Sequence, residues 1–152
     1  MDLDRIDRQI LSLLQADGRL TNAALAEQVH LSPSACLRRV QRLERDGVVR
    51  GYVAVLNAGA IGRGTSVFVE ISLNTQREDA LDAFENAVRD CAEVTECYLM
   101  SGGSDYLLRV AVENTQDYER IHKMHLSRFP HVAKIHSSFA LRTVCERRAI
   151  PL

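Results

Sequence analysis

The sequence is poor in several residue types. It has no tryptophan and three prolines, and aromatic residues make up only 5% of its 152 positions. No apolar run approaches the roughly 18 residues that a membrane span needs. The start, MDLDRIDRQI, carries acids where a signal peptide has basic and apolar residues. We therefore expect a cytoplasmic chain, and 46% hydrophobic with 26% charged residues is typical of a soluble globular protein.

Cysteine is also sparse. The four cysteines (Cys36, Cys91, Cys97 and Cys145) form no CxxC pair and show no zinc-ribbon spacing. In a reducing compartment such residues are usually small buried apolar side chains rather than disulfide partners. We predict no disulfide framework and no metal site built on cysteine.

Charge is unevenly distributed although the formal net charge is only −1. Residues 1–63 carry nine Arg and seven Asp or Glu, a net of +2, whereas residues 64–152 carry ten Lys or Arg and thirteen Asp or Glu, a net of −3. Four arginines fall within eight residues of LSPSACLRRVQRLERDG, the segment 31–47. The first third is therefore the part expected to contact a polyanion such as nucleic acid.

The first third has helical periodicity. Apolar residues recur at steps of three and four in the first segment, with charged residues between them: Leu3, Ile6, Ile10, Leu13 and Leu14. We expect this helix to end near Gly18 in a left-handed cap, and a second helix to begin at Thr21. A third helix is expected after Ser32 as N-cap and Pro33, ending at Gly47, with Cys36, Val40 and Leu43 on its buried face.

Three helices with a tight turn before an arginine-bearing third helix predict a helix-turn-helix that enters the major groove of double-stranded DNA. Ser34, Ala35, Arg38 and Arg39 lie near its front and are candidates for base edges, and the cap Ser32 is a further candidate DNA contact. Arg42 and Arg45 lie farther back and are expected at phosphates. The alternative is a solvated surface helix in which Arg42 and Arg45 balance nearby acids.

Period-two and helical patterns follow one another in the second part. The segment VVRGYVAVL (48–56) is rich in β-formers, and Gly-bearing NAGAIGRG follows it as a linker. We divide the chain into a DNA-binding domain (1–50), a β-rich hinge (51–63) and an α+β domain (64–152). The predicted order in the last is strand, helix, two strands joined by Ser-Gly-Gly-Ser, helix and strand, which is the ferredoxin-like βαββαβ arrangement. The expected segments are 66–73, 77–91, 94–100, 105–112, 115–129 and 132–144.

One face of that sheet should be left without helices. Phe68, Tyr98 and Val110 are assigned to this face and are too apolar for water. A second copy packed sheet to sheet would cover them and give a twofold homodimer. Such a dimer would also provide the two DNA-reading heads that two half-sites require.

The loop SGGSDYLL suggests a ligand. Gly102 and Gly103 leave backbone amides open to an anion, and Asp105 offers a negative charge. Together these groups suit a zwitterion such as a free amino acid. The same residues also fit a bare hairpin turn with no ligand.

The residues quoted above resemble a known family. DLDRIDRQILSLLQADGRLTNAALAEQVHLSPSACLRRVQRLERDGVVRGYVAVLN is similar to the DNA-binding half of the Lrp/AsnC (feast/famine, leucine-responsive) transcriptional regulators. VFVEISL, SGGSDYLLRV and the closing strand resemble their effector-binding half. The resemblance runs from about residue 2 to residue 144. It implies a winged-helix-like first domain, homodimers that associate further into rings such as octamers, and an amino acid bound near the loop where dimers meet.

By the same resemblance, effector contacts are expected at Gly102, Gly103, Ser104, Asp105, Tyr106, Met124, Ser138, Phe139 and Ala140. Two positions depart from the family pattern. His30 stands where the family has Gly before Leu-Ser, which strains the turn, and a plain structural substitution is favoured over an altered DNA preference. Ser104 replaces a larger residue, so leucine specificity is not carried over.

Three other interpretations remain. His122 and His125, three residues apart, could hold a metal, but packing histidines are favoured. A small ferredoxin-like enzyme would need a nucleophile with a base, or a phosphate loop, and no catalytic residue or cofactor motif is found. An architectural, nucleoid-type DNA protein that senses no ligand would use the same first half. We favour a sequence-specific DNA-binding regulator whose assembly or DNA binding responds to an amino acid, with no enzymatic activity.

Overall fold

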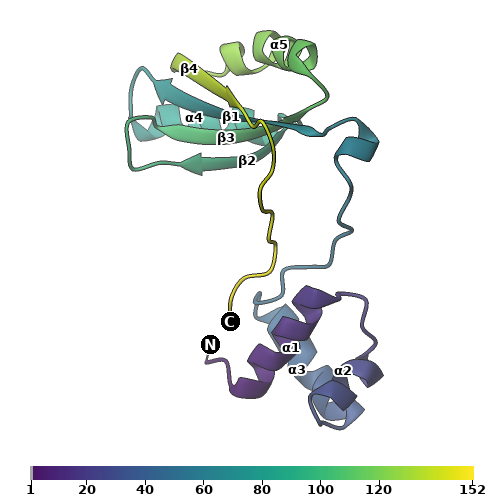
Figure 1. Ribbon diagram of the computed structural model, residues 1–152. Helices are drawn as coiled ribbons and strands as arrows, with labels where there is room; N and C mark the ends of the chain where they lie inside the picture. The colour runs from purple at the N-terminus through teal and green to yellow at the C-terminus, as the bar shows by residue number, and fades with distance from the viewer. Residues whose placement is uncertain (1) are drawn as a thin grey trace. The chain divides into compact units, whose positions relative to one another are not determined.

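A computed structural model describes residues 2–152 and divides the chain into two compact units, seen in Figure 1. The N-terminal unit comprises the described residues up to Val55 together with Val144–Leu152. The sheet unit comprises Leu56–Thr143. In the described part of the chain, no helix combines the length and the apolar character that crossing a membrane would require.

The N-terminal unit consists of three helices, as predicted: α1 (Arg5–Ala16), α2 (Asn22–Gln28) and α3 (Pro33–Arg45). The predicted caps are confirmed, since the Thr21 hydroxyl accepts from the Ala24 amide and the Ser32 hydroxyl from the Ala35 amide. These bonds satisfy amides that a helix start leaves free. The core holds the predicted α3 residues Cys36 and Leu43 and, from the other helices, Ile10, Leu11, Leu25, Ala26 and Val29.

The turn between α2 and α3 takes the left-handed backbone conformation expected at His30, whose φ is 55°. The Leu31 amide then donates to the Ala26 carbonyl at 2.9 Å. Across the turn, the Asn22 side-chain amide donates to the Pro33 carbonyl at 2.8 Å, which ties the start of α2 to the start of α3. The turn fixes where the exposed face of α3 points.

Two predictions about this unit are wrong. α1 ends at Asp17 in extended conformation, and Gly18 is not left-handed; its Cα instead packs near Tyr52, where an added Cβ would lie 3.3 Å from the ring. The segment 48–56, rich in β-formers, also forms no strand. Val53 and Val55 are exposed there. Their β-branched side chains favour strands only where a partner strand or a core is available, and within residues 2–152 these two side chains have neither.

The segment Val144–Leu152 joins the N-terminal unit through α1. The side chain of Gln15 makes two hydrogen bonds with the backbone of Ile150: Nε2 donates to the carbonyl at 3.0 Å, and Oε1 accepts from the amide at 2.6 Å. The N-terminal unit is therefore assembled from two parts of the sequence that lie on either side of the sheet unit.

The sheet unit has the predicted βαββαβ order. Its elements are η1 (Gly59–Ile61), β1 (Thr65–Leu73), α4 (Glu78–Arg89), β2 (Val94–Leu99), β3 (Tyr106–Val112), α5 (Thr115–Met124), η2 (Leu126–Arg128) and β4 (Val132–Phe139). The sheet order is β2-β3-β1-β4, and each neighbouring pair is antiparallel. The ferredoxin-like prediction is confirmed. The closing strand is shorter than predicted, since it ends at Phe139 rather than near residue 144.

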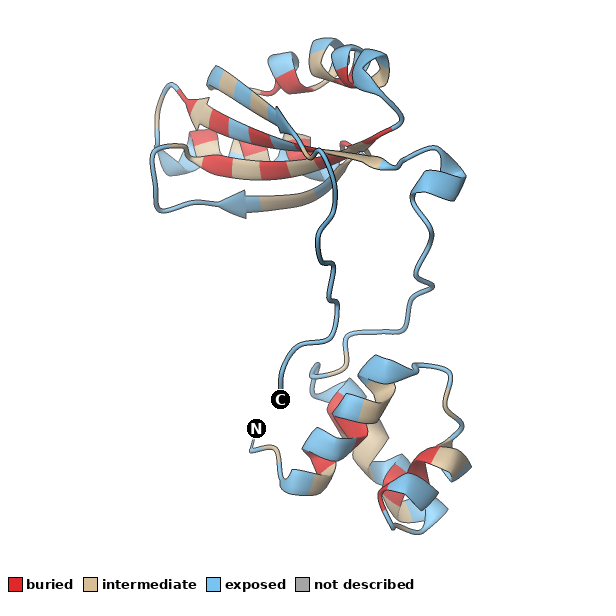
Figure 2. Cartoon of the chain, in the orientation of Figure 1, coloured by how far each residue is buried: buried red, intermediate tan, exposed pale blue. Residues whose placement is uncertain are grey.

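One face of the sheet carries the core, and Figure 2 shows buried and exposed residues alternating along β1. Both α4 and α5 pack on this face, because Phe84 and Ile121 share one cluster with Val67 and Leu108. Val110 belongs to the same cluster and is fully buried, so its assignment to the free face is wrong. Phe68 and Tyr98 lie exposed on the free face as predicted. The error at Val110 is one of register: it pairs with Val67, not with Phe68.

All four cysteines are free thiols, as predicted, but only two are buried, Cys36 and Cys91. Burial raises the pKa of Cys97 to about 11, so its thiol stays protonated at neutral pH. Cys145 is exposed, which the expectation of buried cysteines did not foresee.

His30→Gly should stabilise the N-terminal unit by about 0.5–1 kcal/mol. A left-handed L-residue costs about 1–2 kcal/mol, part of which is offset by the freedom that glycine adds to the unfolded chain. His30→Val, a β-branched residue in the same conformation, should be destabilising. Chemical denaturation of both variants measures this, and equal stabilities of the Gly and Val variants would contradict it.

Candidate functional site

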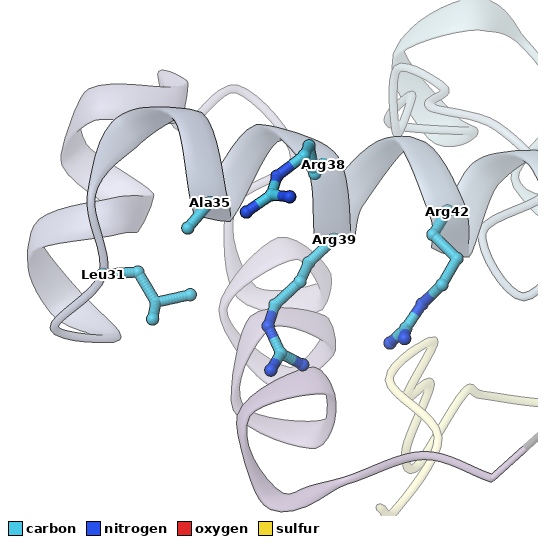
Figure 3. A pocket seen from close by; sticks show the side chains of 5 residues that line it. All are labelled: Leu31, Ala35, Arg38, Arg39 and Arg42. Carbon is cyan, nitrogen blue, oxygen red and sulfur yellow. The ribbon is translucent and has the colours of Figure 1, made fainter.

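An open hollow of about 350 Å³ lies beside the start of α3 and is shown in Figure 3. It is lined by Leu31, Ala35, Arg38, Arg39 and Arg42. Four of these five residues belong to α3, and three of the four arginines of segment 31–47 meet there. In Figure 3 Arg38 points back along the helix toward Ala35, whereas Arg39 and Arg42 extend away from α3.

Arg39 and Arg42 are held by acids at the start of α1. The nearest guanidinium nitrogen of Arg39 lies 2.7 Å from Asp4 Oδ2 and 2.8 Å from Asp7 Oδ1, and that of Arg42 lies 2.5 Å from Asp7 Oδ2. Asp7 is only 1% exposed. The sequence predicts Arg42 on the outer face of α3, but its guanidinium instead turns to α1, because a buried carboxylate there requires partners.

Asp4 and Asp7 also form the N-terminal cap of α1. Each accepts a hydrogen bond from the other's backbone amide, at 3.2 Å for the Asp4 amide and 2.8 Å for the Asp7 amide. The Asp7 amide and the Arg39 guanidinium hold the pKa of Asp4 below its usual value of 3.8, and the two acids raise the pKa of Arg39. One reciprocal cap thus fixes the two carboxylates that α3 uses.

The remaining predicted DNA contacts of α3 are exposed, except Ala35. Ser32 and Ser34 have their hydroxyls 3.3 Å apart, and Ala35 is half-buried. Arg38 is exposed and makes no ion pair or side-chain hydrogen bond within residues 2–152. Arg45 is 72% exposed and lies 3.0 Å from Asp46. An exposed pair of this kind contributes little, so Arg45 can exchange it for another anion.

In the sheet unit, Asp105 ties the β2–β3 hairpin to the end of β1. Its carboxylate accepts from the Leu73 amide and from the Gln76 side chain, both at 2.7 Å. Its own amide donates to the Ile71 carbonyl at 2.9 Å. The predicted hairpin is confirmed, and the Asp105 carboxylate has one hydrogen bond on each oxygen, which leaves lone pairs for a further donor.

The two glycines of the hairpin are not needed for its turn. Gly102 and Gly103 are exposed and neither adopts a left-handed backbone. A Cβ added at either would meet nothing within 4 Å. A side chain would therefore fit at either position, and the half-buried Ser104 follows them.

The other predicted effector residues are dispersed within one chain. Tyr106 is buried with its ring 4.5 Å from that of Phe84, and burial followed by its bond to Glu85 raises its pKa. Met124, at the end of α5, is half exposed. Phe139 packs edge-on against Tyr118 with centroids 5.2 Å apart, and the Ala140 amide donates to the Ser66 carbonyl at 3.0 Å.

Register shows that the hairpin and the closing strand meet different ends of β1. Tyr106 pairs with Ile71, whereas Ser138 and Phe139 pair with Phe68 and Val67. Three or four residues of strand span about 10–13 Å. A single chain therefore does not bring Gly102–Asp105 together with Ser138–Ala140.

The free face of the sheet mixes apolar and charged side chains. Phe68 is 39% exposed and Tyr98 54% exposed. Between them Arg109 pairs with Glu96 at 2.9 Å, and the Tyr98 hydroxyl donates to Glu96 at 3.0 Å. A flat surface with exposed aromatics around a satisfied ion pair suits contact with another protein surface.

Asp7 was not singled out from the sequence, where it falls among the polar residues between the apolar ones of the first helix. The available signal was the Asp-x-x-Asp spacing at a helix start combined with four arginines lacking assigned partners.

His122 lies against Tyr118 with ring centroids 6.0 Å apart, which agrees with a packing role. In residues 2–152, no group of three or more His, Cys, Asp or Glu side chains is placed to hold a metal ion.

Comparison with known proteins covers both units. Residues 3–50 match the family of winged helix-turn-helix DNA-binding domains, and residues 66–150 match the Lrp/AsnC ligand binding domain. The chain is 52% identical over 121 residues to an uncharacterised helix-turn-helix-type transcriptional regulator of Sinorhizobium fredii, covering 80% of this chain and 95% of that protein. It is 47% identical over 131 residues to the leucine-responsive regulatory protein of Escherichia coli, covering 86% and 80%.

Solved structures agree with these matches. A transcriptional regulator of Neisseria meningitidis, in complex with L-Met, superposes with a TM-score of 0.92 at 36% identity, covering 99% of this chain and 97% of that one. An AsnC family regulator of Agrobacterium tumefaciens gives 0.93 at 37% identity, covering 97% and 96%. The matches cover a helix-turn-helix domain followed by a ligand-binding α+β domain, in this order and over nearly the whole chain. They confirm the resemblance: the protein belongs to the Lrp/AsnC family of DNA-binding transcriptional regulators.

Proposed function

We propose that this regulator reads DNA through the exposed front of α3, chiefly Arg38, and that a free amino acid bound beside Gly102–Asp105 changes how its dimers associate. The proposal that α3 reads DNA rests on the exposed guanidinium of Arg38, which is unpaired within residues 2–152. Arg38 lies on the third helix of a helix-turn-helix. An α-helix fits the major groove, where arginine donates two hydrogen bonds to guanine.

Neighbouring residues fit the same role. Ser34, Ala35 and Arg38 are spaced so that they lie along one side of α3. Ser32 caps the helix and leaves its start close to the surface that would meet the duplex. Arg45 is at the far end of the helix and is assigned to phosphate, which positions the protein without reading sequence. Arg39 and Arg42 line the same hollow, but their carboxylate partners set them apart.

The second part rests on the β2–β3 hairpin. Gly102 and Gly103 have no conformational need to be glycine and are exposed, and the missing side chains let a bound carboxylate approach the backbone closely. Asp105 is held in place by two hydrogen bonds and retains acceptor capacity for an ammonium group. The Neisseria relative was solved with L-Met, and the Escherichia coli relative is named for its response to leucine. An α-amino acid therefore suits this loop.

The complete effector site is proposed to need more than one copy of the chain. Gly102–Asp105 and Ser138–Ala140 meet β1 about 10–13 Å apart within one chain, so both groups can face one small ligand only if a second copy supplies one of them. A ligand at such a junction binds one assembly better than another. Differential affinity of this kind shifts the population of assemblies and the spacing of the DNA-reading heads.

The dimer itself is proposed to form through the free face of the sheet around Phe68 and Tyr98. Packing two copies of this face would give a twofold β-sandwich and remove both aromatics from water. Further association of dimers into a ring, and a cytoplasmic location, follow the family resemblance. An architectural protein that senses no ligand remains the alternative, and it would give the same DNA footprint with and without amino acids.

Arg38→Ala should weaken binding to the specific operator by about 1–3 kcal/mol, because a bidentate contact to guanine is lost. Non-specific DNA binding should change much less. Titration of selected and scrambled duplexes by fluorescence anisotropy measures both quantities. Arg19→Ala, which removes an exposed arginine outside α3, is the matched control. Unchanged discrimination between the two duplexes in Arg38→Ala would remove Arg38 from the reading surface.

A screen of the common amino acids for a rise in melting temperature should identify the effector, since a ligand that binds only the folded state stabilises it. Asp105→Asn should abolish that rise while the protein remains folded, because the ammonium loses its counter-charge. Asp82→Asn removes an exposed acid of α4 and should retain the full rise. Binding that survives in Asp105→Asn would show that the ammonium is held elsewhere.

Phe68→Asp should raise the dimer dissociation constant by more than about 100-fold, because twofold symmetry removes two aromatic rings from the interface and buries two new charges, each opposite an Arg109 that Glu96 already neutralises. Sedimentation velocity over a range of concentrations measures the change. Ile61→Asp places the same charge at an exposed apolar residue outside the sheet and should leave the dimer intact. A Phe68→Asp protein that sediments like the wild type would place the interface on another surface.

A further inference from the structure

We propose that Asp7 is a positioning residue for DNA recognition: its buried carboxylate keeps Arg39 and Arg42 off the duplex, so that Arg38 is the free cation of the hollow. This inference rests on the proposed DNA-binding role of α3. It divides the arginines that the sequence groups together into two sets. One set, Arg39 and Arg42, joins α3 to α1, and the other set, Arg38 and Arg45, faces outward.

The contacts of Asp7 leave no carboxylate oxygen without a guanidinium. Oδ1 lies 2.8 Å from Arg39 and Oδ2 lies 2.5 Å from Arg42. With both arginines in place Asp7 is only 1% exposed, so its carboxylate depends on them rather than on water for compensation. Moving one of them to a phosphate would leave a buried negative charge with less compensation, which is costly in a low-dielectric environment.

The arginines are themselves directed into the unit. Arg42 Nε is buried, although the side chain as a whole is 37% exposed, because its terminal nitrogen turns to Asp7. Arg39 is held by two acids. One of its terminal nitrogens donates to Asp4 at 2.7 Å and to Asp7 at 2.8 Å. Side chains fixed in this way are not free to follow a phosphate.

The charges of the cluster cancel. Asp4 and Asp7 supply two negative charges, and Arg39 and Arg42 supply two positive charges. A neutral cluster adds little to the attraction of a polyanion beyond a few ångströms. Of the three arginines that line the hollow, Arg38 then dominates the local positive potential. Sequence discrimination is favoured by this arrangement, because fewer cations are available for non-specific contact with phosphate.

The charge-removing variant Asp7→Asn, a near-isosteric change, tests the inference through the salt dependence of DNA binding. Each phosphate newly neutralised steepens the slope of log K against log salt concentration by about 0.9. Release of one or two arginines should therefore steepen the slope by about 0.9–1.8. Between 50 and 200 mM salt this corresponds to an additional loss of affinity of roughly 3-fold to 12-fold. Binding to a scrambled duplex at low salt should rise.

A merely structural role for Asp7 gives a different result. A partly unfolded reading head would bind both specific and scrambled duplexes more weakly, with an unchanged or shallower slope. That outcome, in a protein shown by thermal melting to be folded at the assay temperature, would overturn the inference.

A second pair of variants decides the question even if Asp7→Asn fails to fold. Arg42→Gln should leave the salt slope unchanged, because Arg42 is not at a phosphate, whereas Arg45→Gln should make it shallower by about 0.9. A shallower slope in Arg42→Gln would show that Arg42 contacts DNA and would refute the inference. Failure of the proposed function is distinguishable, because it appears as unchanged sequence discrimination in Arg38→Ala.

Discussion

The polar contact between α1 and α3 depends on the carboxylate of Asp7. Asp7 is the only charged residue that is buried among those described, and it reaches two arginines that lie 32 and 35 residues later in the sequence. A buried acid that loses a partner is strongly destabilising, so the three side chains form a set that cannot easily be changed one at a time. The interaction fixes the roll of α3 about its axis, and that roll decides which residues of the helix can meet a duplex.

In the sheet unit, apolar residues rather than an ion-pair cluster determine how the elements pack. β1 lies between β3 and β4 and alternates between a fully buried face, at Val67, Val69 and Ile71, and a face that carries Phe68. Both helices cover the buried face, and no helix among the described residues of the sheet unit covers the other. In a single copy, Phe68 and Tyr98 on this second face are therefore left exposed.

Much of the architecture can be predicted from the sequence because it is determined locally. The caps at Thr21 and Ser32 and the left-handed turn at His30 depend on a few adjacent residues. The alternation in β1 and the ferredoxin-like order likewise follow from pattern. Errors arose where the answer depends on distant partners. The face of Val110 depends on strand register, and the absence of a strand at 48–56 depends on whether another strand is available.

The candidate sites show the same division. Arg38 and the Gly102–Asp105 hairpin could be identified from residue type and spacing, whereas the pairing of Arg39 and Arg42 with Asp7 could not, because it requires knowing that α1 and α3 pack at those positions. The hydrogen bonds that Asp105 accepts from Leu73 and Gln76 were unpredictable for the same reason.

The tie between Gln15 and Ile150 has a consequence for how the chain matures. Because Val144–Leu152 belongs to the same unit as α1, the sheet unit is topologically an insertion within the DNA-binding unit. During synthesis the three helices emerge first, yet residues 144–152 can join them only after all of residues 56–143 have been made. Once made, the two hydrogen bonds between Gln15 and Ile150 hold this last segment against α1, so the N-terminal unit is completed by the final residues to be synthesised.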